Sequence, residues 1–438
     1  MMLTGKQATD ERKSVAIVAS GAIRDAYVDA YARSGKVGTA LVFPGSHDMT
    51  SFPREHMHGM MVASFPGTGV NDAEAIAQIC RDVGVAFVDV VHKGAVECNL
   101  PGELRDRGIK CTGPGHEALG LKERKMEVRE FISDIGLSNY LPEARLFGGR
   151  EDTIAYLEGI SNMQPMLVKT KGSETVFASN ASDAIRIVND SNARDAGKDC
   201  KFLIEELQTH GRKIRAIAFS DGRYNTIMGY TDASGHVAIP RRAMDRAGTE
   251  IEMIVDTVFE KLKSPNSTLG GRHVNTLGAE FFVGNDNRTI KILRFRAIPK
   301  SISLAILVSG LDTNFFDLGE SMANGSLADM HVHMDGKETV AITCSAREAA
   351  PKEAQVFGIW DAMRIHGISV YDAGGISVRN GMFYAKGGDL LHVIGKGDDV
   401  AAAMENARAA ASLISTEGGL LYSCGEAKSA SIKDVHRE

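Results

Sequence analysis

The chain has 438 residues, of which 43% are hydrophobic and 24% charged, and its formal net charge is −6. This composition excludes a disordered polar chain and supplies enough apolar side chains for a sizeable buried core. The slight acidic excess gives no general attraction to nucleic acid or to an anionic membrane, so we expect neither as a partner.

The sequence carries no sign of membrane insertion or export. Its longest uninterrupted apolar run lies near Ile302–Val308, far short of the roughly 20 residues that span a bilayer. Residues Met1–Lys13 are polar and charged, without the apolar centre of a signal peptide. The six cysteines are scattered and form no CxxC pair, which is typical of reduced thiols. We therefore expect a cytoplasmic protein.

Residues 14–118 alternate between strand and helix patterns. In chain order the predicted elements are strand Ser14–Ala19, helix Ile23–Arg33, strand Gly38–Phe43, helix Asp72–Val83, strand Val85–Val91, helix Leu100–Gly108 and strand Ile109–Thr112. Val85–Val91 is almost continuously apolar, as in strands that are buried on both faces of a sheet. The alternation predicts an open parallel sheet covered by helices.

The pattern changes after residue 118. A helix rich in Leu, Lys and Glu is predicted over Glu117–Ile135, and the short strands and single helix that follow indicate a small α+β lid at about residues 137–201. The later predicted elements are strands Phe202–Leu207, Lys213–Phe219 and Gly222–Asp232, the amphipathic helix Glu250–Lys263, and the hairpin strands Ala279–Val283 and Thr289–Phe295.

From about residue 336 short strands are followed by an Ala-rich helix over Asp398–Leu413. We therefore expect a mixed α/β and α+β chain in five parts. These are a polar extension (1–13), an N-terminal α/β domain (14–118), a central domain (119–334), a C-terminal domain (335–425) and a polar tail (426–438).

Several local runs resemble one enzyme family. The run Gly-Ile-Ser-Val-Tyr-Asp-Ala-Gly-Gly from Gly367, and the run Tyr-Ala-Lys-Gly-Gly-Asp-Leu-Leu-His-Val-Ile-Gly from Tyr384, resemble the closing domain of phosphoribosylamine–glycine ligase, an ATP-grasp enzyme. The run from Gly113 to Lys125 resembles the entry of that family into its ATP-grasp region. The resemblance extends in order over residues 14–425 and implies a pre-ATP-grasp α/β domain, a central ATP-grasp domain with a lid, and a C-terminal mixed domain.

The resemblance also implies an activity and a site. It implies an ATP-dependent carboxylate–amine ligase of purine biosynthesis that works through an acyl phosphate, with ATP as cofactor, small amine and carboxylate substrates, and a monomer or homodimer. The positions that match the family's nucleotide site are Lys125, Lys169, Lys171, Glu205, Glu206 and Leu207. The positions that match its phosphoribosyl side are Gly21, Arg24, Gly387 and Gly388.

The metal site departs from the family pattern. Where the family has a Glu and, two residues on, an Asn that bind Mg²⁺, this chain has Arg294 and Arg296, which share one strand face and repel a cation. We assign the two arginines as catalytic residues that contact phosphates or an anionic substrate. Glu280 is the remaining candidate metal ligand, although beside two arginines an ion pair is the more natural arrangement. Mg²⁺ is therefore expected only if Glu280 holds it.

Other departures leave alternatives open. The glycine-rich phosphate loop is reduced to Thr170–Thr175 with one glycine, and Lys213 stands where the family has a carboxylate for the ribose. One alternative is a catalytically inactive homologue with a degenerate active site that acts as a binding or regulatory protein. Another is a ligase of specialised metabolism that has changed both substrates.

Overall fold

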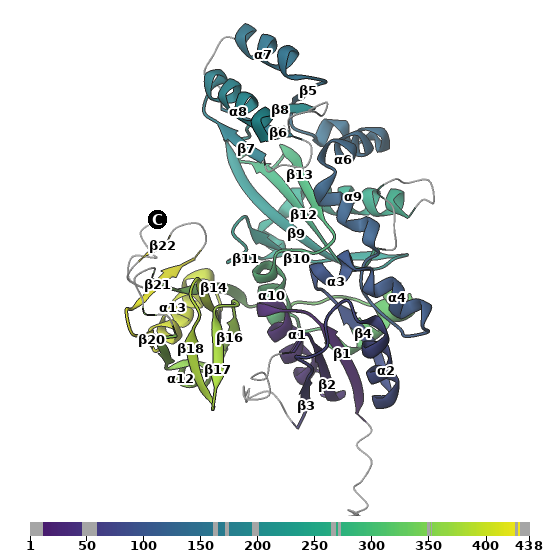
Figure 1. The fold of residues 1–438 in the computed structure, drawn as a ribbon, viewed down its shortest axis with the longest axis vertical. Helices are drawn as coiled ribbons and strands as arrows, with labels where there is room; N and C mark the ends of the chain where they lie inside the picture. The colour runs from purple at the N-terminus through teal and green to yellow at the C-terminus, as the bar shows by residue number, and fades with distance from the viewer. Residues whose placement is uncertain are drawn as a thin grey trace, which may run out of the picture.

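The structure of the protein is a computed structural model. Figure 1 shows an elongated molecule with a lid at one end, a central sheet below it, and N-terminal and C-terminal parts side by side at the other end. The described residues are 12–45, 59–160, 165–170, 175–194, 201–263, 269, 273–347, 351, 353–424 and 428–429. No helix within these ranges is long and apolar enough to cross a membrane.

The N-terminal part is a parallel sheet in the order β3-β2-β1-β4, as the alternating pattern predicted. Its strands and helices are β1 (Lys13–Val18), α1 (Gly21–Arg33), β2 (Val37–Phe43), β3 (Met61–Ser64), α2 (Ala73–Val83), β4 (Val85–Val90), α3 (Lys93–Glu97) and α4 (Leu100–Asp106). Buried side chains fill both faces of β1 and β4, which explains their continuous apolar sequence.

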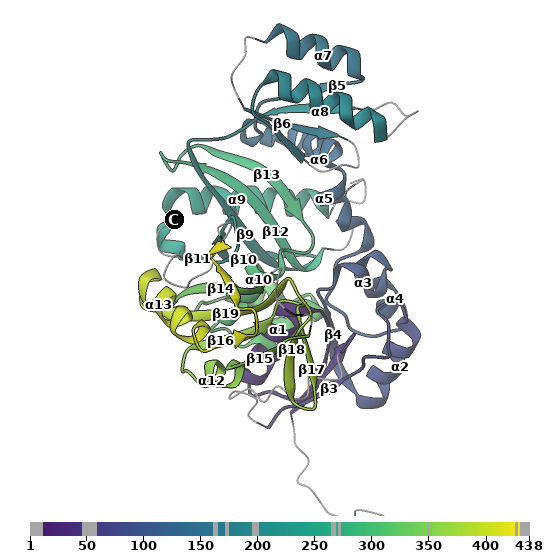
Figure 2. The same ribbon diagram turned by 60° about the vertical axis from the view of Figure 1, so that its left-hand side comes forward.

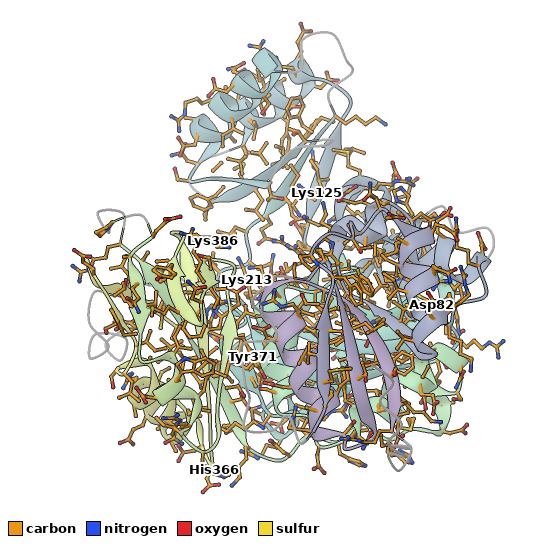
Figure 3. All side chains as sticks on the ribbon, turned by 60° about the horizontal axis from the view of Figure 1, so that its bottom comes forward. Asp82, Lys125, Lys213, His366, Tyr371 and Lys386 are labelled. Atoms are coloured by element: carbon orange, nitrogen blue, oxygen red, sulfur yellow. The ribbon has the colours of Figure 1, made fainter. Side chains whose placement is uncertain are left out.

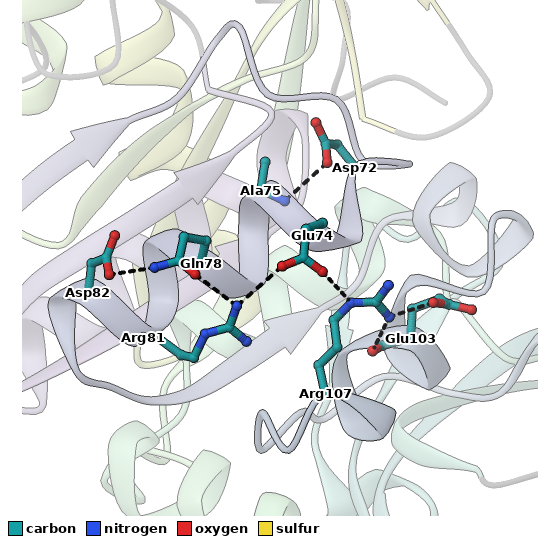
Figure 4. A network of polar contacts seen from close by, with 8 residues as sticks. All are labelled: Asp72, Glu74, Ala75, Gln78, Arg81, Asp82, Glu103 and Arg107. Carbon is teal, nitrogen blue, oxygen red and sulfur yellow. Dashed lines mark hydrogen bonds and ion pairs between the residues drawn. The ribbon is translucent and has the colours of Figure 1, made fainter.

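Helix α2 begins and ends at residues suited to those positions. Asp72 caps its N-terminus by accepting a hydrogen bond from Ala75 N at 3.0 Å, and Gly84 ends it with a left-handed φ of 72°. On the exposed side, the Glu74 carboxylate pairs with Arg107, which directly follows α4 (Figure 4). Such exposed pairs add little stability, so burial of the opposite face of α2 holds the helix in place.

The middle of the chain forms two further antiparallel sheets. The lid sheet has the order β5-β8-β6-β7, and the central sheet the order β11-β10-β9-β12-β13. Their elements are α5 (Gly120–Glu123), α6 (Lys125–Ile132), β5 (Ala144–Phe147), α7 (Arg150–Gly159), β6 (Met166–Thr170), β7 (Thr175–Ala178), α8 (Ala181–Arg194), β8 (Phe202–Glu206), β9 (Gly211–Asp221), β10 (Asn225–Asp232), β11 (Ala238–Ile239), α9 (Asp245–Leu262), β12 (Val274–Gly284), β13 (Ile290–Arg296), α10 (Ser301–Ser309) and α11 (Phe315–Asn324). The apolar face of α9 shares one buried core with the central sheet, as its predicted amphipathic pattern requires.

The C-terminal part packs two antiparallel sheets, β16-β19-β14-β21-β22 and β17-β18-β15-β20. Its elements are β14 (Glu338–Ala346), β15 (Gln355–Phe357), α12 (Ile359–Met363), β16 (Ile368–Asp372), β17 (Ile376–Arg379), β18 (Met382–Ala385), β19 (Asp389–Gly397), α13 (Val400–Ala411), β20 (Ser415–Thr416), β21 (Leu420–Ser423) and β22 (Lys428–Ser429). The Ala-rich helix α13 packs closely against β19. Glycine at position 395 allows this approach, because a Cβ there would lie only 2.5 Å from Ala407 N.

Two sequence predictions are wrong. The helix expected over Glu117–Ile135 is broken at Arg124, whose ψ of 62° separates α5 from α6. The strand expected over Ile109–Thr112 reduces to one bridge between Val88 and Cys111. Helices α10 and α11 were not predicted, and eight of the nine residues of α10, Ile302 to Ser309, are buried.

Helix α10 lies where the parts of the molecule meet (Figure 2). Its side chains share one hydrophobic core with α1, with β9 and β10, and with residues of the C-terminal strands β14, β16 and β19. A helix that is apolar on every side is stable only when it is surrounded, so these parts enclose a common core.

A buried carboxylate joins the N-terminal sheet to the central sheet. Asp89 on β4 is fully buried and accepts hydrogen bonds from Tyr31 Oη at 2.6 Å, from Thr112 Oγ1 at 2.5 Å and from the side-chain amide of Asn275 on β12. Burial raises the pKa of Asp89, and the three donors oppose that rise. The network therefore satisfies a buried polar group while fixing β12 against β4.

A second polar contact joins the central sheet to the C-terminal part. Thr343 Oγ1 lies 2.8 Å from His236 Nε2 and 2.8 Å from His392 Nδ1. Burial lowers the pKa of His392 to about 4, and His236 adds to that lowering. Both rings are therefore expected to be neutral near pH 7.

We expect Asp89→Ala to lower the free energy of unfolding by about 3 kcal/mol or more, because three buried donors would lose their acceptor. The measurement is the urea midpoint of unfolding. Asp82→Ala is the matched control, since exposed Asp82 accepts only from Gln78 in α2 and its loss should cost no more than about 0.5 kcal/mol. Equal midpoints for both variants would contradict the role of Asp89.

We expect stability to fall as the pH drops from about 6.5 toward 4. In that range the unfolded chain protonates His392 while the folded protein keeps it neutral, so the unfolded state binds more protons. His392→Asn should reduce this pH dependence of the unfolding midpoint, whereas the exposed His366→Asn should not change it. An unchanged pH profile in His392→Asn would argue against burial of a neutral ring.

Candidate functional site

A cavity of about 730 Å³ lies between the lid sheet and the central sheet. Apolar side chains from α6, β6, β8 and β13 form part of its wall. The charged side chains that line it are Lys122, Lys125, Arg129, Lys169, Lys213, Arg294 and Arg296, and Glu123, Glu205 and Glu206. Seven cations thus face three carboxylates on a chain whose net charge is negative, so the cavity is suited to an anion.

Both predicted phosphate-binding lysines line this cavity. Lys125 begins α6, and its Nζ lies 3.3 Å from Thr175 Oγ1 on β7. Lys169 lies near the end of β6, and its Nζ is 2.6 Å from Glu205 Oε1. Burial lowers the pKa of Lys169, and Glu205 opposes that shift. Lys171 lies outside the described residues.

The predicted hinge residues Glu205 and Glu206 end β8, Leu207 follows it, and all three line the cavity, but their side chains differ. The carboxylate of Glu205 is buried and pairs with Lys169 and, at 3.5 Å, with Arg129. Glu206 is exposed toward the cavity, and Leu207 follows the strand. Glu205 therefore holds cations in place, which leaves Glu206 and the backbone as the groups of the hinge that a ligand can reach.

An ion-pair row crosses the central sheet beside these lysines. Glu280 on β12 lies opposite Arg215 on β9 and opposite Arg294 on β13. Arg215 Nε donates to Glu280 Oε1 and Arg294 Nε to Glu280 Oε2, each at 2.8 Å. Burial opposes the negative charge of Glu280, yet Arg294, Arg215 and Arg296 together hold its pKa below the usual value.

Arg215 was missed in the sequence. It lies two residues after Lys213 in a strand that is otherwise mostly apolar, and this spacing puts both cations on one strand face. The alternation of Lys213 and Arg215 with apolar residues is the pattern in the sequence that could have indicated a second cation beside the cavity. Only the register of β9 against β12 brings Arg215 to Glu280.

The residues around Glu280 do not fit a divalent cation. Both carboxylate oxygens already accept hydrogen bonds from guanidinium groups, whose positive charges repel a metal cation. Within the described ranges, no group of three His, Cys, Asp or Glu side chains could hold a metal ion.

The four residues assigned to the phosphoribosyl side meet at a different place. Arg24 at the start of α1 pairs with Asp372 at 3.3 Å, and a Cβ on Gly21 would lie 3.4 Å from the Asp372 carbonyl. Gly387 and Gly388 follow β18, and the Gly387 carbonyl lies near Gly375 in the turn after Asp372. These residues gather where α1 meets the C-terminal part and do not line the cavity.

The labelled lysines mark these two places in Figure 3. Lys125 and Lys213 come from α6 and β9 and line the cavity, whereas Lys386 precedes the Gly387–Gly388 turn. The charge of Lys386 acts on Asp372, whose pKa burial raises. Lys386 therefore belongs to the junction with the C-terminal part and not to the cavity.

Comparison with known proteins identifies the fold. No family model matches the chain. In an alignment of 433 positions that covers 93% of this chain, it is 20% identical to the trifunctional purine biosynthetic protein adenosine-3 of Homo sapiens, but it spans only 41% of that protein. It is 23% identical to phosphoribosylamine–glycine ligase of Caulobacter vibrioides, covering 93% of this chain and 96% of that protein. The chain thus spans about two fifths of the length of the first curated relatives that it matches.

A solved structure of phosphoribosylamine–glycine ligase from Thermotoga maritima matches 92% of this chain and 98% of that chain, with a TM-score of 0.69 and 17% sequence identity. The chain therefore has the ATP-grasp fold and resembles phosphoribosylamine–glycine ligases, as its sequence motifs predicted.

We expect Glu280→Ala to lower the free energy of unfolding by about 3 kcal/mol or more, because buried Arg215 would be left without its carboxylate. Glu206→Ala, which removes an exposed carboxylate from the same cavity, should change it by no more than about 0.5 kcal/mol. Urea denaturation of both variants measures the difference. Similar midpoints would mean that the row contributes little to stability.

Proposed function

We propose that the cavity binds ATP and that the chain is an ATP-dependent carboxylate–amine ligase similar to phosphoribosylamine–glycine ligase. The observation that carries the proposal is that Lys125, Lys169 and the hinge residues Glu206 and Leu207 line one cavity between two sheets. Its volume of about 730 Å³ is suited to a small cofactor, because such pockets measure roughly 300–1,000 Å³.

One part of the cavity lining is suited to the base of a nucleotide and another part to its phosphates. Apolar side chains such as Val128, Leu203 and Ile292 would pack against the base beside the hinge. Lys125, Lys169 and the arginines of β13 would neutralise the phosphates. This division supports a nucleotide over an uncharged ligand.

The proposed reaction has two steps. A carboxylate oxygen of the first substrate attacks the γ-phosphorus of ATP, and ADP leaves to give an acyl phosphate. The amine nitrogen of the second substrate then attacks the acyl carbon, so that a C–N bond forms, inorganic phosphate leaves and the nitrogen loses a proton. Such transfer depends mostly on positioning and on neutralising charge.

Arg294 and Arg296 are the proposed catalytic residues, because guanidinium groups stabilise the negative charge on a transferring phosphoryl group. Gly21, Arg24, Gly387 and Gly388 are proposed to bind the amine substrate where α1 meets the C-terminal part. We propose small-molecule substrates, a cytoplasmic location, and a monomer or homodimer. The substrates are either those of purine biosynthesis or altered ones.

One observation favours a second function. Both oxygens of Glu280 are occupied by arginines at the place where the family's metal site is expected. A chain that had lost catalysis could keep the nucleotide cavity and act as a binding or regulatory protein. The two functions differ in turnover and not in nucleotide binding.

We expect repeated turnover of ATP to ADP, beyond one equivalent per protein, only when a suitable carboxylate and amine are both present. Lys169→Ala should slow this ADP release by about 100-fold or more, because a buried cation facing the phosphates would be lost. The measurement is ADP release over a panel that begins with glycine and phosphoribosylamine generated in place. Lys337→Ala is the matched control, since exposed Lys337 pairs with Asp398 outside the cavity.

Nucleotide binding without ADP release from any pair of the panel would favour the regulatory function. Absence of ATP binding in calorimetry would contradict both functions. Equal loss of activity in Lys169→Ala and Lys337→Ala would contradict the assignment of Lys169.

A further inference from the structure

The centre of the inference is the excess of positive charge around Glu280. Arg215, Arg294 and Arg296 surround it, and the charge of Lys300 acts on the same group of arginines. One carboxylate therefore faces four cations. Paired strands fix this arrangement, because Arg215, Glu280 and Arg294 lie opposite one another across β9, β12 and β13.

Arg296 differs from Arg215 and Arg294, each of which donates a hydrogen bond to Glu280. Its side chain lines the cavity, and its Nε is buried without a hydrogen-bond partner among the described residues. Burial lowers the pKa of Arg296, the charge of Glu280 opposes that shift, and Arg294 and Arg215 add to the lowering. Arg296 is only partly buried, but a buried N–H group next to like charges is costly unless an acceptor takes its hydrogen bond. Arg296 can therefore offer its charge and its Nε–H group to an anion that enters the cavity.

The cationic surface continues from Arg296 along the cavity. Arg294 is half-exposed, so one side of its guanidinium remains accessible while Nε holds Glu280. The charge of Arg294 also acts on Lys169, and Arg294, Arg296 and Lys169 line the same cavity. Guanidinium groups suit the planar, bidentate recognition of phosphate oxygens.

We propose that this site takes a nucleoside polyphosphate in its metal-free form, with Arg294 and Arg296 supplying the positive charge that a divalent cation would otherwise supply. The inference rests on the proposed function for the presence of a nucleotide in the cavity. It goes beyond that function in stating which ionic form of the nucleotide binds. Mg²⁺ then competes with the protein for the phosphates, and the metal complex meets the repulsion of four cations.

The test is calorimetric titration of the full chain with ADP and with ATP, in EDTA and in excess Mg²⁺. We expect the dissociation constant to be at least tenfold lower in EDTA than in Mg²⁺. Binding that requires Mg²⁺, or that is tighter with it, would overturn the inference and leave the proposed function standing. No binding under either condition would overturn both.

Two variants locate the effect. Arg296→Gln removes the unpartnered guanidinium and should weaken metal-free ADP binding about tenfold, as expected for one lost charge-assisted contact, while changing binding of the Mg²⁺ complex much less. Arg288→Gln is the matched control, because exposed Arg288 lies in the turn between β12 and β13 and does not line the cavity. An equal effect of both variants would overturn the inference.

The double variant Arg294→Glu with Arg296→Asn provides a reversed test. It restores the carboxylate and amide types that hold Mg²⁺ in the resembled family, so ADP binding should become tighter with Mg²⁺ than with EDTA. A variant that folds, by circular dichroism, and still prefers metal-free ADP would overturn the inference. If it does not fold, Arg296→Gln still decides.

Discussion

The hydrogen bonds to buried Asp89 set the frame in which the candidate site is built. Asn275, one of its three donors, has a φ of 94°, a backbone region that few side chains adopt. The network holds that conformation at the start of β12, and Glu280 follows five residues later on the same strand. The position of the ion-pair row therefore depends on a contact between the N-terminal and central sheets that lies outside the cavity.

Much of the fold could be predicted because its patterns are local. The apolar strands β1, β2 and β4 and the amphipathic helix α9 each carry their signal within a dozen or so residues. Helix α10 has no such signal, because an apolar stretch without periodicity is compatible with a buried helix or with a strand. The break at Arg124 was missed for the opposite reason, since good helix-forming residues continue across it. The domain boundaries stay a prediction.

The candidate site was only partly readable from the sequence. Lys125, Lys169 and Glu206 were assigned from motifs, and the fold brings them to one cavity, although their roles stay predictions. The ion pair between Glu205 and Lys169 could not be predicted from the sequence, because it depends on the register of β6 against β8. Arg215 and the His236–Thr343–His392 contact depend on residues far apart in the chain, and propensity and periodicity report nothing about such distances.

Helix α10 has a consequence for how the protein can be divided. It is buried on every side, and its neighbours come from the N-terminal part, the central sheet and the C-terminal strands. A fragment cut near residue 334 would uncover one flank of α10 and expose Leu, Ile and Val side chains to water, which favours aggregation. Dissection of the chain into separately expressed domains would therefore fail at this boundary unless the exposed flank were redesigned with polar side chains. The lid, by contrast, has a small hydrophobic core of its own, so its removal would uncover little of the common core.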